Sequence, residues 1–203
     1  MTIITQSIVT PLPGKAALAL SRVQRMVANI TRLGVAARVF KVVMGDGVGS
    51  LVLLGRYPDF ASVTRAAVAM SKDPAIIALN AERENEQAAV VTGPYVYRSV
   101  FGEVSTQAVL LVREYQISRK NLKDAIALLP EAKAATDPKS GMLALVPLIA
   151  SEMDRLVVSY YADSIEDLGE KMDKYGLSEA FAAAATKASH HGTVVRASAM
   201  AVI

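Results

Sequence analysis

The sequence predicts an α+β protein made of two ferredoxin-like units, each with the element order β-α-β-β-α-α-β, whose antiparallel sheets pack face to face as one barrel. Three observations predict this fold class. At an offset of 104 positions the two halves of the 203-residue chain align by pattern without a gap. Each half alternates strand-like and helix-like segments in the same order. The strand-like segments are apolar on both faces, so their sheets need cover on both sides.

The alignment divides the chain into two units, residues 1–102 and 103–203. Tyr57 falls on Tyr161, and Thr92–Ser99 falls on the C-terminal run Arg196–Ile203. Few residues are identical, so the likeness is one of pattern. We interpret it as the tandem duplication of one supersecondary unit of about 100 residues, a size that can carry its own core.

Strands are predicted where β-branched residues run between turn residues, and helices where apolar residues recur every three or four positions. In the first half the strands are Ile3–Val9, Arg38–Met44, Ser50–Tyr57 and Thr92–Val100, and the helices are Lys15–Leu33, a segment capped by Asp59 or Ser62 and ending near Ser71, and Ala75–Ala88. Asp73-Pro74 breaks the last two helices apart. The run Gly45–Gly49 joins two strands, which predicts a hairpin turn with positive φ and not a phosphate loop leading into a helix.

The second half repeats this order with its own turn residues. The predicted strands are Ala108–Glu114, Met142–Ile149, Arg155–Tyr161 and Thr193–Val202, and the predicted helices are Ser118–Ala135, Ser164–Lys174 and Glu179–Ser189. Gly176 makes the break that Asp73-Pro74 makes in the first half. Right-handed crossovers turn each order into a four-stranded antiparallel sheet with helices on one face, and the other half of the chain is the natural cover for the second face.

This element order, with its broken second helical segment, resembles the dimeric α+β barrel superfamily, which includes antibiotic-biosynthesis-monooxygenase-like, NIPSNAP-like and EthD-like domains. The resemblance covers nearly the whole chain as two fused copies and has no diagnostic motif. Haem-degrading relatives of this fold use a histidine, an asparagine and a tryptophan. The chain has no tryptophan and has Gln6 or Leu110 where a first-strand asparagine would lie, so we expect no haem and no other cofactor.

Composition excludes several classes of function. The net charge of +3 is spread over both halves without a run of five like charges, which argues against nucleic-acid binding. No stretch approaches 18 apolar residues, so we expect no membrane span. The chain has no cysteine, which excludes thiolate metal sites, and no signal peptide is evident, so a cytoplasmic protein is expected.

Two tyrosines are the first candidate site residues. Tyr95 and Tyr97 lie on one face of a strand, and the offset of 104 places them against Ala199 and Ala201. Large side chains in one half and small ones in the other could leave space for a ligand, and the tyrosines would then donate or accept protons. Complementary core packing is the alternative.

Charged residues complete the candidate set. The predicted strands also carry four basic residues: Lys41, Arg98, Arg196 and Arg56. One of them turned inward would anchor an anion or an enolate. A position at a strand end, in water, is the simpler interpretation of each. His190 precedes His191-Gly192, which is typical of a helix end, and is a candidate general base. Adjacent histidines point about 100° apart on a helix and are poor joint metal ligands, so no metal site is predicted.

These features, with the resemblance, suggest a cofactor-independent oxygenase or a small-molecule binder for an aromatic or polyketide-like ligand. The resemblance allows equally a non-catalytic structural or interaction module of the NIPSNAP-like type. We expect a small hydrophobic or aromatic ligand as the partner, neither nucleic acid nor membrane, and association into a homo-oligomer as one option.

Overall fold

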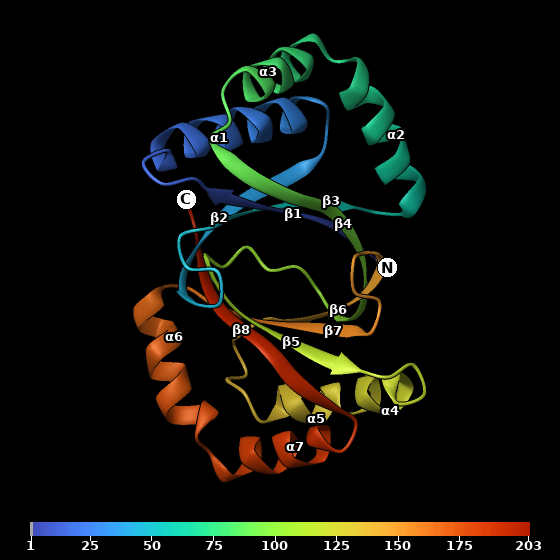
Figure 1. Cartoon of the computed structure of the whole chain (residues 1–203). Coiled ribbons are helices and arrows are strands. Elements are labelled where there is room, and N and C mark those ends of the chain that lie inside the picture. The colour runs from blue at the N-terminus through green and yellow to red at the C-terminus, as the bar shows by residue number, and fades with distance from the viewer. Residues whose placement is uncertain (1) are drawn as a thin grey trace.

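Eight antiparallel strands close into one barrel in the computed structural model of the chain, which describes residues 2–203 (Figure 1). The first half contributes β1 (Ile3–Pro11), α1 (Ala16–Arg32), β2 (Ala36–Gly45), β3 (Leu51–Tyr57), α2 (Phe60–Lys72), α3 (Pro74–Asn85) and β4 (Ala89–Gly102). The second half contributes β5 (Val109–Ile117), α4 (Leu122–Ala127), α5 (Leu129–Ala134), β6 (Met142–Ile149), β7 (Arg155–Ala162), α6 (Ile165–Lys171), the π-helix Met172–Gly176, α7 (Glu179–Ser189) and β8 (Gly192–Val202). The predicted α+β class is confirmed.

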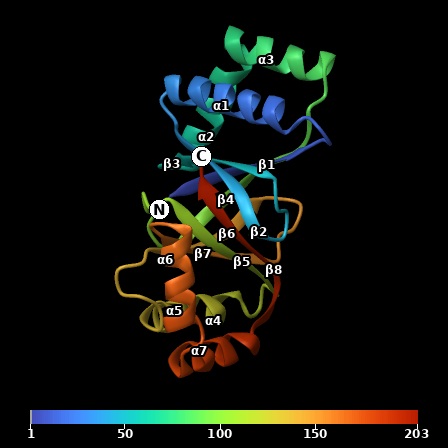
Figure 2. The same cartoon turned by 90° about the vertical axis from the view of Figure 1, so that its left-hand side faces the viewer.

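The two halves join along two seams. Around the barrel the strands follow the order β1-β3-β2-β8-β5-β7-β6-β4, and β4 pairs with β1 again. The strands β2 and β8 form one seam, and β4 and β6 form the other. Closure leaves no free sheet edge, and the helices of each half cover the outside of that half's strands, as the two views show (Figures 1 and 2).

The barrel interior is a contact between the two halves. A buried apolar cluster inside it draws side chains from both, including Phe40, which is only 2% exposed. Separate clusters lie outside the barrel, between each group of strands and its own helices. Both faces of each sheet are therefore covered, as the sequence predicted.

The strand registers do not keep the offset of 104. Inward-facing residues in equivalent places are separated by 106, 105 and 103 positions in successive strands: Ile4 and Leu110, Phe40 and Leu145, Tyr97 and Met200. A gap-free alignment is wrong for the strands because a slip of one residue turns every side chain to the opposite face. The origin of the halves by duplication stays a prediction.

The register difference changes which residues correspond. Tyr57 lies on the outside of the barrel under the helices, whereas Tyr161 lies inside it. Tyr95 corresponds to Ser198, because Gln6 pairs with Tyr95 as Val112 pairs with Ser198. The expected opposition of the two tyrosines to Ala199 and Ala201 is wrong by one residue, since Ala199 packs on the helix side.

The helices begin where capping residues predict, with one difference. The Asp59 carboxylate accepts a hydrogen bond of 2.7 Å from the Ser62 N–H, and Asp73 accepts from the N–H groups at the start of α3. The single helix expected over Ser118–Ala135 is instead two short helices, and the first begins at Leu122 after Asn121, so Ser118 does not cap it. Pro130, in the first turn of α5, lacks the N–H that a continuous helix needs. Among residues 2–203, no helix is long and apolar enough to cross a membrane.

Glycines with positive φ lie at both seams. Gly45 (φ 81°) ends β2 opposite β8, and Gly102 (φ 70°) ends β4 opposite β6. A Cβ on Gly45 would stand 2.3 Å from the Ala197 carbonyl oxygen, and one on Gly102 would stand 1.8 Å from the carbonyl oxygen of Met142. Gly47 and Gly49 also have positive φ, which confirms the predicted hairpin turn.

The seam can be tested by comparing Gly102→Ala with Gly34→Ala. Gly34 also has positive φ, but a Cβ there meets nothing within 4 Å, so its replacement should cost only the strain of a left-handed alanine, roughly 1–2 kcal/mol. Gly102→Ala should cost about 2–5 kcal/mol, because an overpacked contact adds about 1–3 kcal/mol to the same strain. Urea unfolding of both variants measures the difference, and equal losses would contradict the role assigned to the close approach.

Candidate functional site

A large cavity lies in the first half, between the outer face of the strands and the helices α1, α2 and α3. Its volume is about 800 Å³. Apolar side chains form most of its wall, among them Val23, Met26, Leu53, Val63 and Leu79. We call this space the helix–sheet cavity. An apolar enclosure of this size with a few polar groups is typical of a site for a small organic molecule.

Arg22 brings a buried positive charge to the cavity. It occupies the apolar stripe of α1 and is only 8% exposed. Its guanidinium donates to the carbonyl oxygens of Glu86 (2.6 Å) and Glu82 (3.1 Å), and the Glu86 carboxylate lies 3.9 Å away. Its Nε has no hydrogen-bond partner. A buried donor without a partner is costly, which marks Arg22 as a residue of the cavity wall whose polar group is not fully satisfied.

Tyr57 supplies a phenol to the same cavity. It ends β3 on the outer face and is buried, and burial raises the pKa of its hydroxyl, against the opposing effect of a hydrogen bond with Thr5. The group is therefore a neutral phenol at physiological pH and can donate a hydrogen bond. Gly55 makes room for it, since a Cβ there would stand 2.7 Å from the Thr5 hydroxyl oxygen and 3.2 Å from the Tyr57 ring.

Polar residues of α3 form the rim of the cavity. Asn80, Arg83 and Glu84 all line it and are exposed, and the Arg83 guanidinium donates to the Asn80 side-chain oxygen at 3.4 Å. Glu84 is the acidic residue among those that line the cavity. The rim therefore combines a carboxylate, an amide and a guanidinium beside an apolar interior.

The corresponding space in the second half is filled by side chains. A cavity of only about 40 Å³ remains there. The rings of Tyr160 and Phe181 pack edge to face with centroids 6.5 Å apart, and the Arg113 guanidinium lies over both. Of these two helix–sheet spaces, the one in the first half is large enough for an organic ligand.

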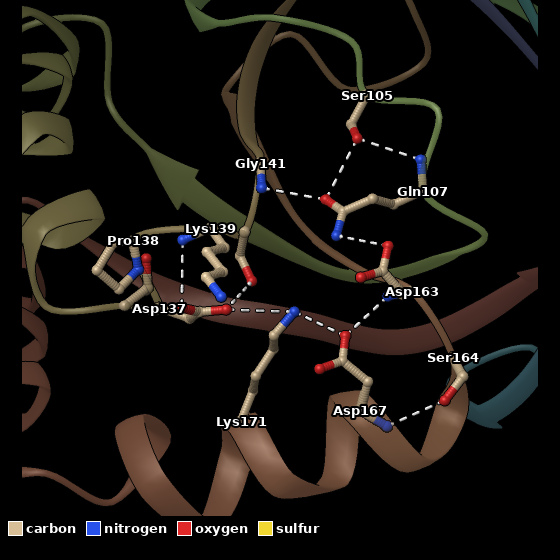
Figure 3. Close-up of polar contacts among 12 residues, drawn as sticks. Ser105, Gln107, Asp137, Pro138, Lys139, Gly141, Asp163, Ser164, Asp167 and Lys171 are labelled. Atoms are coloured by element: carbon tan, nitrogen blue, oxygen red, sulfur yellow. Dashed lines mark hydrogen bonds and ion pairs between the residues drawn. The ribbon is translucent and has the colours of Figure 1, made fainter.

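A polar network closes the second half beside that small cavity (Figure 3). The Lys171 ammonium lies between the carboxylates of Asp167 (2.7 Å) and Asp137 (3.4 Å). The Gln107 side chain donates to Asp163 at 3.1 Å and accepts from the Gly141 N–H at 3.2 Å. These contacts tie α6 and the segment between the halves to the barrel wall.

The tyrosines predicted as site residues face the barrel interior. Tyr97 lines a second cavity, of about 490 Å³, inside the barrel. Burial raises the pKa of Tyr97 to about 12, and the negative charge of Glu114 adds to the effect. Tyr95 shares the inner face of β4 but lines neither large cavity.

The other predicted site residues lie apart from both cavities. Lys41 and Arg98 are exposed and face outward. Arg196 forms an ion pair of 3.6 Å with Glu114 near one end of the barrel. His190 follows the end of α7 and is exposed. The structure brings three of the six predicted residues near one another, since Tyr95 and Arg196 both act on the pKa of Tyr97, and it leaves Lys41, Arg98 and His190 apart. The proposed roles of all six stay predictions.

Sequence reasoning missed Arg22 and assigned Tyr57 only a packing role. A signal for Arg22 was present, because it interrupts the stripe Ala19, Val23, Met26 and Ile30 at helical spacing, where a charge must be buried or paired. Nothing in the sequence could show that the helices leave a cavity in one half and not in the other.

The residues present do not fit a haem held by histidine. Neither His190 nor His191 lines either large cavity. Among the described residues, no group of three or more histidines and carboxylates is placed to hold a metal ion. The groups that the cavities themselves offer are the guanidinium, phenol and carboxylate side chains described above.

Comparison with known proteins gives the fold. No family model matches the chain. No curated protein matches it either. Solved structures do: an anthrone oxidase-like protein (TM-score 0.69, 11% identity, 100% of this chain and 91% of that one) and a Fusobacterium nucleatum protein with the provisional name monooxygenase (TM-score 0.64, 10% identity, 99% and 92%).

A chlorite dismutase mutant from Candidatus Nitrospira defluvii is also similar, with a TM-score of 0.56, 11% identity and coverage of 100% of this chain and 90% of that one. All three have dimeric α+β barrel folds. At these identities the likeness shows architecture alone. The chain has the α+β barrel fold that these proteins share.

Proposed function

We propose that the chain binds a flat, largely apolar aromatic molecule in the helix–sheet cavity and oxidises it with molecular oxygen, without a cofactor. One observation carries the proposal: the cavity of about 800 Å³ places a buried guanidinium with an unpartnered Nε and a buried neutral phenol beside an apolar wall. The names monooxygenase and anthrone oxidase-like among the structural neighbours favour oxidation over binding alone.

The chemistry that fits is oxidation of a methylene group activated by aromatic rings and a carbonyl. Loss of a proton from such a carbon leaves negative charge on the carbonyl oxygen. Arg22 and Tyr57 both line the cavity, and a hydrogen bond from either of them to that oxygen would stabilise the charge. Glu84, at the rim, is the carboxylate available to accept the proton.

The overall step balances with oxygen as the only co-reactant. The methylene carbon loses two hydrogens and gains one oxygen atom to become a carbonyl. The other oxygen atom leaves as water with those two hydrogens. The four electrons that reduce oxygen come from the ligand, so neither a flavin nor a metal is required.

Occupancy of the cavity can be tested with anthrone and a pair of variants on one helix. Ala67 of α2 lines the cavity, whereas Ala69 lies on the same helix away from it, and both are exposed. Ala67→Trp should weaken anthrone binding at least tenfold because the indole takes up ligand space, and Ala69→Trp should bind as the unmodified chain does. Fluorescence titration measures both. Equal affinities for the two variants would place the ligand elsewhere.

Oxidation can be tested separately from binding. The chain should consume one molecule of oxygen for each anthrone converted and release no hydrogen peroxide, as an oxygen electrode and a peroxide assay would show. Tyr57→Phe should lower the rate about 10²-fold by removing one donor to the developing charge. Tyr175→Phe, in the π-helix of the second half, is the control and should keep the rate. Binding of anthrone without oxygen consumption would leave a binding protein and refute the oxygenase.

A further inference from the structure

The cavity inside the barrel is separate from the helix–sheet cavity and has a different character. We call it the interior cavity; its volume is about 490 Å³. Strands of both halves line it with apolar side chains, including Phe40, Leu54, Leu110, Leu143, Val157 and Met200. An eight-stranded barrel is just wide enough either to be filled by its own side chains or to hold one small ligand. Here the side chains leave ligand-sized space.

One end of the interior cavity carries two arginines from neighbouring strands. Arg38 of β2 and Arg56 of β3 both line it. Arg38 donates to the carbonyl oxygens of Ser105 (3.2 Å), Thr106 (3.3 Å) and Gln107 (3.1 Å), and its guanidinium lies 4.9 Å from the centre of the Phe40 ring. It thus holds the segment between the halves across the mouth of the cavity.

Arg56 is the uncommitted cation at this mouth. Within residues 2–203 it takes part in none of the ion pairs or side-chain hydrogen bonds that the structure shows, and it is exposed. Its guanidinium can therefore accept an anion without breaking a contact. A planar guanidinium matches a carboxylate through two parallel hydrogen bonds.

The opposite end of the barrel disfavours a negative charge. The Glu114 carboxylate lies there on the inner face of β5, close enough to Tyr97 for its charge to raise that phenol's pKa. It is paired with Arg196 at 3.6 Å, and burial raises the pKa of Glu114 itself. A ligand with one acidic end would therefore place its acid at Arg56 and Arg38 and not beside Glu114.

We propose that the interior cavity binds a carboxylic acid with an aliphatic body, whose carboxylate pairs with Arg56 and Arg38 and whose chain lies among the apolar side chains of the barrel. The site shares no polar residue with the proposed oxidation site. The proposal of an interior site can therefore be confirmed or refuted independently of the proposed oxidation.

Calorimetric titration of the full chain with decanoate and with 1-decanol tests the charge. The two probes have the same chain length, so their difference reports the carboxylate. Decanoate should bind at least about tenfold more tightly, with one molecule per chain, as expected for a charge-assisted contact. Arg56→Gln should reduce the preference to less than about threefold. Arg98→Gln, an exposed arginine on the outside of the barrel, should leave it unchanged.

The place of the aliphatic body is tested by chain length and by filling the cavity. From hexanoate to decanoate each methylene should tighten binding about three- to fourfold, the ratio that burial of a methylene predicts. Val157→Phe should abolish binding of decanoate, and Leu54→Phe, at a less buried position, serves if the first variant does not fold. Ala67→Trp, which narrows the helix–sheet cavity, should have no effect.

Three results would overturn the proposal. Equal affinities for decanoate and 1-decanol would remove the anion site. A folded Leu54→Phe or Val157→Phe chain that binds decanoate normally would place the ligand outside the barrel. Loss of decanoate binding in Ala67→Trp would assign it to the helix–sheet cavity. Failure to bind or oxidise anthrone would leave the interior site untouched.

Discussion

Backbone pairing along the two seams is the constraint on which the rest of the structure depends. Each half has a four-stranded sheet with two edges, and an open edge exposes unpaired N–H and C=O groups. The pairings of β2 with β8 and of β4 with β6 satisfy those groups and close the barrel. The same closure brings the inner faces of the two sheets together. Gly45 and Gly102 permit it, because their backbones approach the partner strands too closely for a side chain.

Closure of the barrel creates two kinds of space in the molecule: the barrel interior, and the space between the strands and the helices of each half. Inside the barrel, side chains of both halves meet across a common axis, so a ligand there would contact both. Outside it, each half packs against its own helices and is free to differ. The second half has filled this space with Arg113, Tyr160 and Phe181, while the first half keeps a cavity beside Arg22 and Tyr57. The two halves therefore differ in how tightly their helices and strands pack.

The arginines of the two cavities also differ in their exposure to water. In the helix–sheet cavity the Arg22 guanidinium is buried and held by backbone carbonyl oxygens, so it is organised before any ligand arrives. Such groups can stabilise charge that develops during a reaction. At the mouth of the interior cavity Arg56 is exposed to water, where it can attract an anion but stabilises it less. The first arrangement suits chemistry, and the second suits binding.

Much of the architecture was predictable from the sequence. Periodicity, turn residues and the doubly apolar strands predict the element order and the mutual cover of the two sheets. Pro130 and Arg22 were visible signals that were overlooked. The strand register was not predictable, because a shift of one residue preserves the hydrophobic pattern of a strand that is apolar on both faces and yet reverses which side chain faces inward. The cavities depend on that register and on how far each helix stands from its sheet. Only the tertiary structure therefore places Tyr57 under the helices, Tyr161 inside the barrel and Arg56 at the mouth of the interior cavity.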